Sequence, residues 1–156
     1  MNYWIFKSEP SNYSIDDLQK DTVTEWNGIR NYQVRNMIRD DMQPGDKVLF
    51  YHSSCKDIGI TGSATVTSAA QPDSLQFQKN SPYFDPKSTS GNPRWLSVNI
   101  TFVEKFPYVV SLTEIRSQVV LQNLTLLKKG NRLSITKISA SEYRLIAALA
   151  KKKNVM

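Results

Sequence analysis

The sequence has one cysteine, one histidine and no hydrophobic run long enough to cross a membrane. With Cys55 alone, an internal disulfide cannot form and a cysteine zinc cluster is excluded, so the chain suits a reducing compartment. The start "MNYWIFKSEP" turns polar early and lacks the apolar stretch of a signal peptide. We therefore expect a cytoplasmic protein, associated with the nucleoid if it is bacterial, with no metal, no cofactor and no membrane partner.

Positive charge, in contrast, is in surplus. Twenty basic residues face fourteen acidic ones, which leaves a net charge of +6 and a pI near 9.4. Such a surplus favours a polyanionic partner such as nucleic acid. The 156 residues, 40% of them hydrophobic, suffice for one globular domain, which we place at residues 1–150, with a basic tail at 151–156. The sequence does not give the oligomeric state, although a monomer is favoured.

Five segments have the pattern of strands. Tyr3–Phe6 is short and aromatic, and Lys47–His52 follows the turn sequence Pro-Gly-Asp. Apolar residues alternate with polar ones in Ile58–Thr67 and Trp95–Phe106, which is typical of half-buried strands. A last strand is predicted at Leu133–Ile138.

Three segments have the signature of a helix start. Ser14–Asp17, Ser111–Glu114 and Ser139–Glu142 each place a hydroxyl three residues before a carboxylate, a pair that can satisfy free amides at a helix N-terminus. Strands joined by short helices predict an α+β domain built on a small mixed barrel. Residues 71–93, from Gln71 to Pro93, are poor in aliphatic side chains and predict a long loop, which in a compact domain is more often functional than idle.

The stretch "WNGIRNYQVRN" is predicted to form a turn at Asn27-Gly28 and then a helix whose core face includes Val34 and Ile38. Arg30 would oppose the macrodipole in the first turn of that helix. Two interpretations remain open for it: an anionic ligand near Arg30 and the free amides, or an internal salt bridge to Glu9 or Glu25. Trp26 likewise fits either a lid on the core or a stacking platform for a planar ligand.

Seven segments, in order along the chain, resemble the EVE domain family of the PUA-like superfamily. They are "YWIFKSEPSNYSIDDL", "WNGIRNYQVRNMIR", "PGDKVLFYHSS", "GITGSATV", "YFDPKS", "PRWLSVNITFVEKF" and "LSITKISASEY". The resemblance implies a PUA-like mixed β-barrel with helices packed around it, related in shape to YTH domains. It further implies a non-catalytic reader of modified bases, chiefly modified cytosines in DNA.

The resemblance also implies which residues contact the base and which hold the backbone. Trp26 would form a wall of the base pocket, and polar residues would match the base edge. The implied pocket residues are Lys7, Ser8, Glu9, Trp26, Arg30, Asn31, Tyr51, His52, Ser53, Arg94 and Trp95. The implied phosphate contacts are Arg35, Arg39, Lys87, Lys128, Lys129 and Arg132.

Three other functions compete with a reader of modified cytosine in DNA. An RNA-binding module that reads a modified base is not separable from a DNA reader by sequence, although DNA is favoured. A protein-interaction domain would bury Trp26 and leave no base pocket. An enzyme is disfavoured because His52 and Ser53 are neighbours on a predicted strand and point to opposite faces, so they cannot pair as base and nucleophile.

Overall fold

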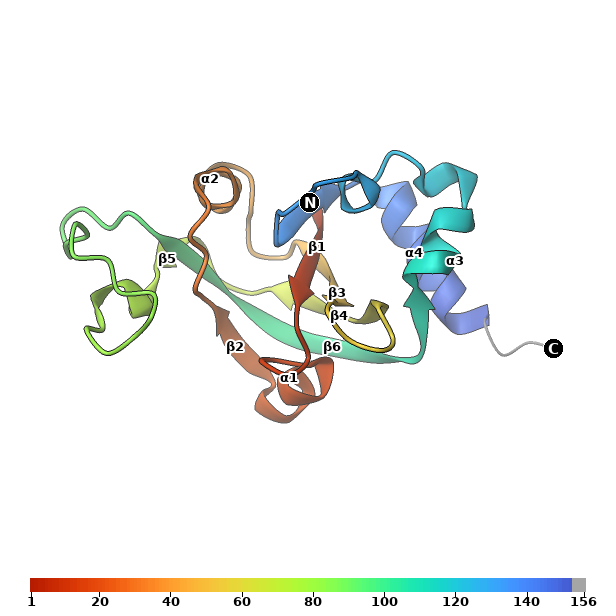
Figure 1. The fold of residues 1–156 in the computed structure, drawn as a ribbon, viewed down its shortest axis with the longest axis horizontal. Coiled ribbons are helices and arrows are strands. Elements are labelled where there is room, and N and C mark those ends of the chain that lie inside the picture. Colours follow the sequence, from red (N-terminus) through yellow and green to blue (C-terminus); the bar gives the residue numbers. More distant parts are fainter. Residues whose placement is uncertain (153–156) are drawn as a thin grey trace.

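The computed structural model describes residues 1–152 (Figure 1). These residues contain seven strands, four α-helices and three short 3-10 helices, joined by loops. Residues 153–156 of the predicted basic tail lie outside the described residues. In chain order the elements are β1 (Tyr3–Ser8), α1 (Ile15–Asp21), β2 (Val23–Trp26), α2 (Tyr32–Asp40), β3 (Lys47–His52), β4 (Gly59–Val66), β5 (Gln71–Pro72), η1 (Ser74–Phe77), β6 (Leu96–Ser111), α3 (Leu112–Ser117), η2 (Val119–Leu121), η3 (Thr125–Leu127), β7 (Ile135–Ile138) and α4 (Ala140–Lys152).

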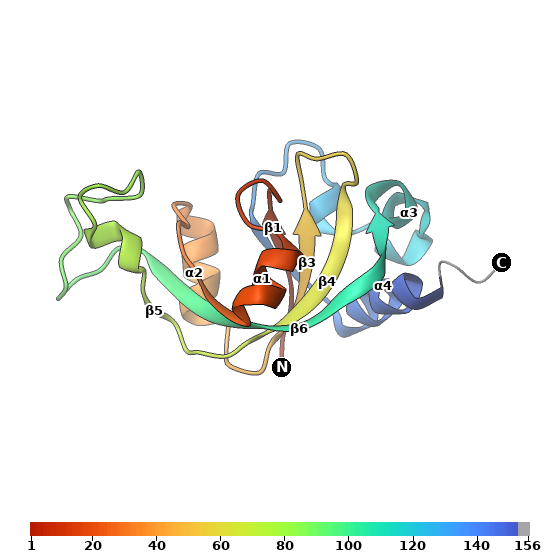
Figure 2. The ribbon, with the colours of Figure 1, turned by 90° about the horizontal axis from the view of Figure 1, so that it is seen from below.

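The strands form one mixed sheet in the order β2-β6-β4-β3-β1-β7, and β5 pairs with β6. Strands β1 and β3 are parallel, and the other pairs are antiparallel. The long strand β6 runs across the whole molecule, with the loop that precedes it at one end and α3 and α4 at the other (Figures 1 and 2). The predicted α+β class is confirmed.

Two hydrophobic cores lie on the two faces of this sheet, because successive side chains of a strand point in opposite directions. On one face Phe6 and Phe50 pack with residues of α1 and α2, such as Leu18 and Ile38. On the other face Tyr51 and its neighbours pack with α3 and α4. Alternate residues of β1 and β3 therefore pack against different helices.

The helix starts follow the predicted capping pattern. Ser14 Oγ accepts a hydrogen bond from Asp17 N, and the Asp17 carboxylate accepts one from Ser14 N. Ser139 and Glu142 make the same reciprocal pair ahead of α4, and Ser111 caps α3.

All five predicted strands are present, most of them with shifted ends. The strand Lys47–His52 is as predicted, whereas the last strand begins at Ile135 and β6 continues to Ser111. Strand β2 was missed, because four residues are too few to show a period. It matters for function, since β2 ends at Trp26 and pairs with β6, which fixes the indole relative to the sheet.

Candidate functional site

A cavity of about 480 Å³ opens between the end of β1, strand β2 and the loop that precedes β6. Its volume lies within the range of about 300–1,000 Å³ that is usual for small-molecule sites. The wall residues that matter most for its chemistry are Lys7, Ser8, Glu9, Glu25, Trp26 and Tyr83. The structure thus brings together four of the predicted pocket residues, Lys7, Ser8, Glu9 and Trp26, at one opening.

Trp26 contributes both to the core and to the cavity. Its ring centroid lies 5.4 Å from that of Phe6 and 5.5 Å from that of Phe50, and it also meets the edge of Tyr13. The side chain is nevertheless only half-buried, and it lines the cavity. The lid interpretation therefore holds for the side of the indole that packs on Phe6 and Phe50, and the stacking platform stays a prediction for the side that lines the cavity.

The segment after β1 forms the polar side of the opening. Ser8 Oγ donates to the Tyr13 carbonyl at 2.6 Å, and the Glu9 carbonyl accepts from the amides of Asn12 and Tyr13. Burial raises the pKa of Tyr13 to about 12, and its hydroxyl donates to Asp21. The turn is therefore held by its own hydrogen bonds, and Ser8 keeps acceptor capacity toward the cavity.

Glu25 supplies a carboxylate that binds the loop before β6. Its oxygens accept from Ser74 N at 3.1 Å, from Ser74 Oγ at 2.7 Å and from Ser97 Oγ at 2.7 Å. Burial alone would raise the pKa of Glu25, but these hydrogen bonds outweigh it and hold the pKa below its usual value. Glu25 is therefore ionised at neutral pH and ties the loop to β2 and β6.

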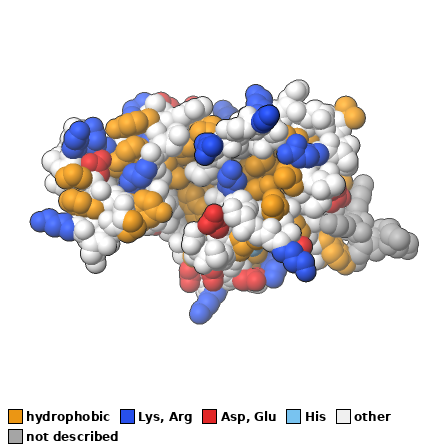
Figure 3. Space-filling model, viewed as in Figure 1, with side chains coloured by type: hydrophobic (Ala, Val, Ile, Leu, Met, Phe, Trp, Pro, Cys, Tyr) orange, Lys and Arg blue, Asp and Glu red, His pale blue; other side chains and the backbone are white. Residues whose placement is uncertain are grey.

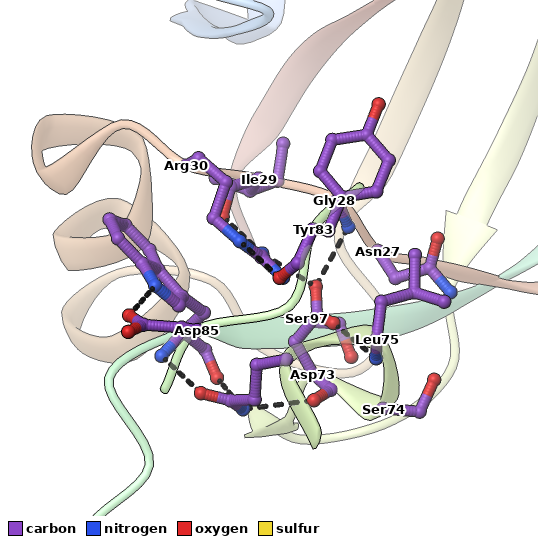
Figure 4. Close-up of polar contacts among 12 residues, drawn as sticks. Asn27, Gly28, Ile29, Arg30, Asp73, Ser74, Leu75, Tyr83, Asp85 and Ser97 are labelled. Carbon is purple, nitrogen blue, oxygen red and sulfur yellow. Dashed lines mark hydrogen bonds and ion pairs between the residues drawn. The ribbon is translucent and has the colours of Figure 1, made fainter. Parts of the chain in front are cut away.

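Arg30 differs from the sequence expectation in its place and in its partner. It precedes the N-cap of α2 instead of lying in the first helical turn, and it pairs with neither Glu9 nor Glu25. Its partner is Asp73, at 3.2 Å, which also accepts from the Gly28 amide at 2.7 Å (Figure 4). The anionic group beside Arg30 is thus the Asp73 carboxylate of the protein itself, which comes from the loop before β6.

Asn31, Arg94 and Trp95 have internal partners, and none of them lines the cavity. The side chain of Asn31 caps α2 by accepting from Val34 N. The indole of Trp95 is buried and donates to Asp85 at 2.8 Å, and Arg94 pairs with the same carboxylate. Their predicted contact with a base stays a prediction, and the structure gives each a supporting role.

Tyr51, His52 and Ser53 do not line this cavity. Tyr51 is buried on the face of the sheet opposite to that of Phe50, because adjacent residues of a strand point to opposite faces. Nε2 of His52 accepts from the Ile15 amide at 3.1 Å, and burial lowers the His52 pKa. His52 lines a separate cavity of about 370 Å³ beside Cys55 and Lys105. The end of β3 therefore supports α1, while the end of β1 forms the opening.

Of the predicted phosphate contacts on α2, Arg35 is half-buried and Arg39 is exposed. The Arg35 guanidinium donates to the Arg94 carbonyl at 3.0 Å and lies 4.8 Å from the centre of the Tyr32 ring. Arg39 pairs with Asp40 on the surface.

The other predicted phosphate contacts are exposed. They lie in the loop before β6 and in the segment before β7: Lys87, Lys128, Lys129 and Arg132. Arg132 is two residues from Ser134, which lines the cavity. Figure 3 shows basic side chains spread over the hollowed face, with acidic ones gathered mainly at the lower edge, where α1 lies in Figure 1. This distribution suits a polyanion that crosses the opening.

Sequence reasoning missed Tyr83, which lines the cavity from the loop, and the buried Asp73, which binds Gly28 and Arg30 behind it. The available signal was the loop itself, residues 71–93, which was predicted to be functional because of its length. No local pattern could tell which of its residues would reach Gly28 and Arg30, because the contact spans more than forty positions in the sequence.

The curved mixed sheet, its surrounding helices and one aromatic-walled opening define a PUA-like α+β domain. A YTH domain of Zygosaccharomyces rouxii, 14% identical, has the same fold, with a TM-score of 0.53 over 96% of this chain and 86% of that chain. Within this class the chain belongs to the EVE domain family, whose model matches residues 2–149.

Two relatives show how far the similarity extends. A hypothetical protein from Leishmania major is 42% identical and superposes with a TM-score of 0.92, over 98% of this chain and 96% of that chain. Human thymocyte nuclear protein 1 is 36% identical over 97% of this chain and 75% of its own length. The crystal structure of human THYN1 in complex with DNA that contains 5-methylcytosine superposes with a TM-score of 0.89, at 35% identity, over 97% of this chain and 99% of that chain.

Among residues 1–152, no helix is long and apolar enough to cross a membrane. Within the same residues, no group of three or more His, Cys, Asp or Glu side chains could hold a metal ion.

Proposed function

We propose that this protein is a non-catalytic reader of modified bases that accepts a modified cytosine, flipped out of DNA, in the cavity beside Trp26. The observation that carries the proposal is the cavity of about 480 Å³, with a half-buried indole on one side and Lys7, Ser8 and Glu9 on the other. The whole-length likeness to human THYN1, which has been crystallised with 5-methylcytosine DNA, supports the same ligand class.

The energetics suit this role. Flipping a base costs a few kcal/mol, and stacking on an aromatic side chain returns about 1–3 kcal/mol per base. A methyl group adds about 0.8 kcal/mol when it is buried, so discrimination between plain and methylated cytosine should be moderate. Exposed basic side chains, among them Lys87 of the loop before β6 and Arg132, would hold phosphates and make the affinity fall with salt.

A catalytic role is not supported by the only histidine. His52 Nε2 is occupied by the Ile15 amide, and its cavity is separate from that of Trp26. A general base must be within hydrogen-bond reach of its nucleophile, and His52 instead holds a helix start.

The test is a binding panel at two salt concentrations. Dissociation constants are measured for DNA duplexes with plain, 5-methyl and 5-hydroxymethyl cytosine at one position, and for RNA with and without N6-methyladenine. We expect a preference of roughly 3- to 10-fold for a modified cytosine over plain cytosine, from about one buried methyl group or hydrogen bond. Equal affinity for plain and modified DNA would overturn the reader function, and a preference confined to methylated RNA would move it to RNA.

A further inference from the structure

Tyr83 forms the wall of the cavity that comes from the loop. Its side chain lines the same opening as Trp26 and is 42% exposed. Its ring lies directly over Gly28: a Cβ added there would come within 3.3 Å of Tyr83 Cζ (Figure 4). Gly28 also has a φ of +81°, which L side chains rarely adopt. The backbone of the Gly28 turn thus leaves a place that the aromatic ring fills.

The guanidinium of Arg30 holds Tyr83 by its backbone. Arg30 Nε and Nη2 both donate to the Tyr83 carbonyl, at 3.2 and 2.6 Å, and the guanidinium carbon lies 5.4 Å from the ring centre. Nη1 donates to the Ile29 carbonyl at 2.7 Å and to Asp73 at 3.2 Å. All four hydrogen bonds go to acceptors of the protein itself.

Asp73 completes the attachment from below. It is fully buried, and its Oδ2 accepts from Gly28 N and from Arg30, while Oδ1 accepts from Leu75 N. One carboxylate therefore joins the turn after β2, the guanidinium and the start of η1. A buried carboxylate with three donors is a strong tether, since breaking one charged hydrogen bond costs more than breaking a neutral one.

We infer that Tyr83 is a second aromatic wall that selects the base, and that Arg30 is a positioning residue that acts through Tyr83 and does not touch phosphate. The inference rests on the proposed function and assigns its selectivity to a residue outside the sheet. The ligand class is a planar base that enters between the indole of Trp26 and the phenol ring of Tyr83. Asp73 sets the guanidinium so that its two donors reach the Tyr83 carbonyl.

Arg30 and Tyr83 can be tested separately because the hydrogen bonds end on a backbone atom. Tyr83→Ala removes the ring and keeps the carbonyl that Arg30 binds, whereas Tyr83→Phe keeps the ring. Arg30→Lys keeps a positive charge beside the buried Asp73 but loses the fork of two donors to one oxygen. The matched control is Arg144→Lys, at an exposed arginine of α4 that has no assigned role in binding. Thermal unfolding checks that each variant is folded.

The experiment measures affinity for 5-methylcytosine and plain DNA against salt for wild type, Y83A, Y83F, R30K and the double variant R30K/Y83A. Loss of one stacking ring should lower affinity for the modified DNA roughly 10-fold in Y83A, with Y83F close to wild type. R30K should show a smaller loss in the same direction, with an unchanged salt slope. The double variant should match Y83A alone, because Arg30 acts through the ring.

Each alternative has its own signature. Y83A with the base preference of wild type overturns the second wall, and R30K with that preference overturns the positioning role. Because R30K keeps the charge, the phosphate role is tested in Arg30→Gln, where a salt slope lower by about 1 makes Arg30 a phosphate contact. Additive losses in the double variant show that Arg30 and Tyr83 act independently. If wild type itself shows no preference, the proposed function fails and this inference fails with it.

Discussion

The two aromatic walls of the cavity are held in different ways. Trp26 belongs to the side of the cavity that the end of β1 and strand β2 form, which we call the sheet wall. Its ring packs there on the rings of Phe6 and Phe50. Tyr83 belongs to the side of the cavity that the loop before β6 forms, which we call the loop wall. Tyr83 is 42% exposed there, and Arg30 donates to its backbone carbonyl. The sheet wall is thus fixed by apolar packing, and the loop wall by polar hydrogen bonds.

This difference predicts how each side of the cavity responds to substitutions. Apolar packing tolerates small changes, whereas a buried polar network depends on every member, because a single unsatisfied group costs about 1–3 kcal/mol. The loop before β6 depends on two such members, Asp73 and Gln76, both fully buried. We therefore expect substitutions in the sheet wall to change binding and stability together. In the loop wall they should disorder a local segment.

The largest effect is expected for Trp26→Ala. Removing the indole takes away the platform and leaves a gap beside Phe6 and Phe50, so the free energy of unfolding should fall by about 3 kcal/mol. Preference for the modified base should be lost, because stacking supplies about 1–3 kcal/mol. Denaturant unfolding and the binding panel measure both, and Trp26→Phe, which keeps a ring, is the control. Unchanged preference in the alanine variant would make the sheet wall purely structural.

The next largest effect is expected for Gln76→Leu in the loop wall. Gln76 Nε2 donates to the carbonyls of Asp73 and Trp95, at 2.9 and 2.8 Å, and its Oε1 accepts from Trp95 N at 3.0 Å. Leucine leaves the Trp95 amide without this partner and removes one hydrogen bond from each of the two carbonyls, of which that of Trp95 still accepts from Asp73 N, at a cost of about 2–3 kcal/mol. Amide hydrogen exchange should rise in residues 73–95 and stay unchanged in β1 and β3. Uniform exchange across the whole chain would contradict a local loop wall.

A smaller, pH-dependent effect is expected for His52, which supports α1 behind the sheet wall. Burial lowers its pKa below the usual value of 6.5. The folded state thus takes up this proton less readily than the unfolded state. The histidine contribution to stability is therefore complete above pH 6.5 and is lost as the pH falls from 6.5 through the folded pKa.

His52→Gln tests this sign, because glutamine keeps an acceptor for the Ile15 amide and cannot titrate. The variant should match wild type at pH 7.5 and lose less stability between pH 6.5 and 5.5, as measured by thermal unfolding. His52 is the only histidine, so this pH range isolates it from the carboxylates. Parallel curves for both proteins would show that His52 is not the titrating group.

The smallest effect is expected for Arg39→Ala. The Arg39 and Asp40 side chains are both exposed, so the free energy of unfolding should change by less than about 0.5 kcal/mol. If Arg39 holds a phosphate, affinity for plain and modified DNA should fall equally and the salt slope should drop by about 1. A change in base preference would place Arg39 with the walls and not with the backbone contacts.

Local sequence determined what depends on near neighbours. The capping pairs that start α1 and α4, the strand Lys47–His52 and the core face of Val34 and Ile38 could be predicted because each rests on a period or on a spacing of three residues. The seven family segments also pointed to Trp26 and to the segment Lys7–Glu9, which the structure places at one cavity.

Tertiary structure decided what depends on distant partners. The parity of β3 sends Tyr51 to the face opposite Phe50, and no local pattern showed which face carried the cavity. The acid expected beside Arg30 proved to be Asp73, forty-three positions away, because loop closure and burial choose the partner of a charge, and sequence proximity does not. The sequence by itself determined most of the elements and pointed to the residues of the sheet wall, and the folded chain decided strand β2 and the loop wall, because both depend on distant partners.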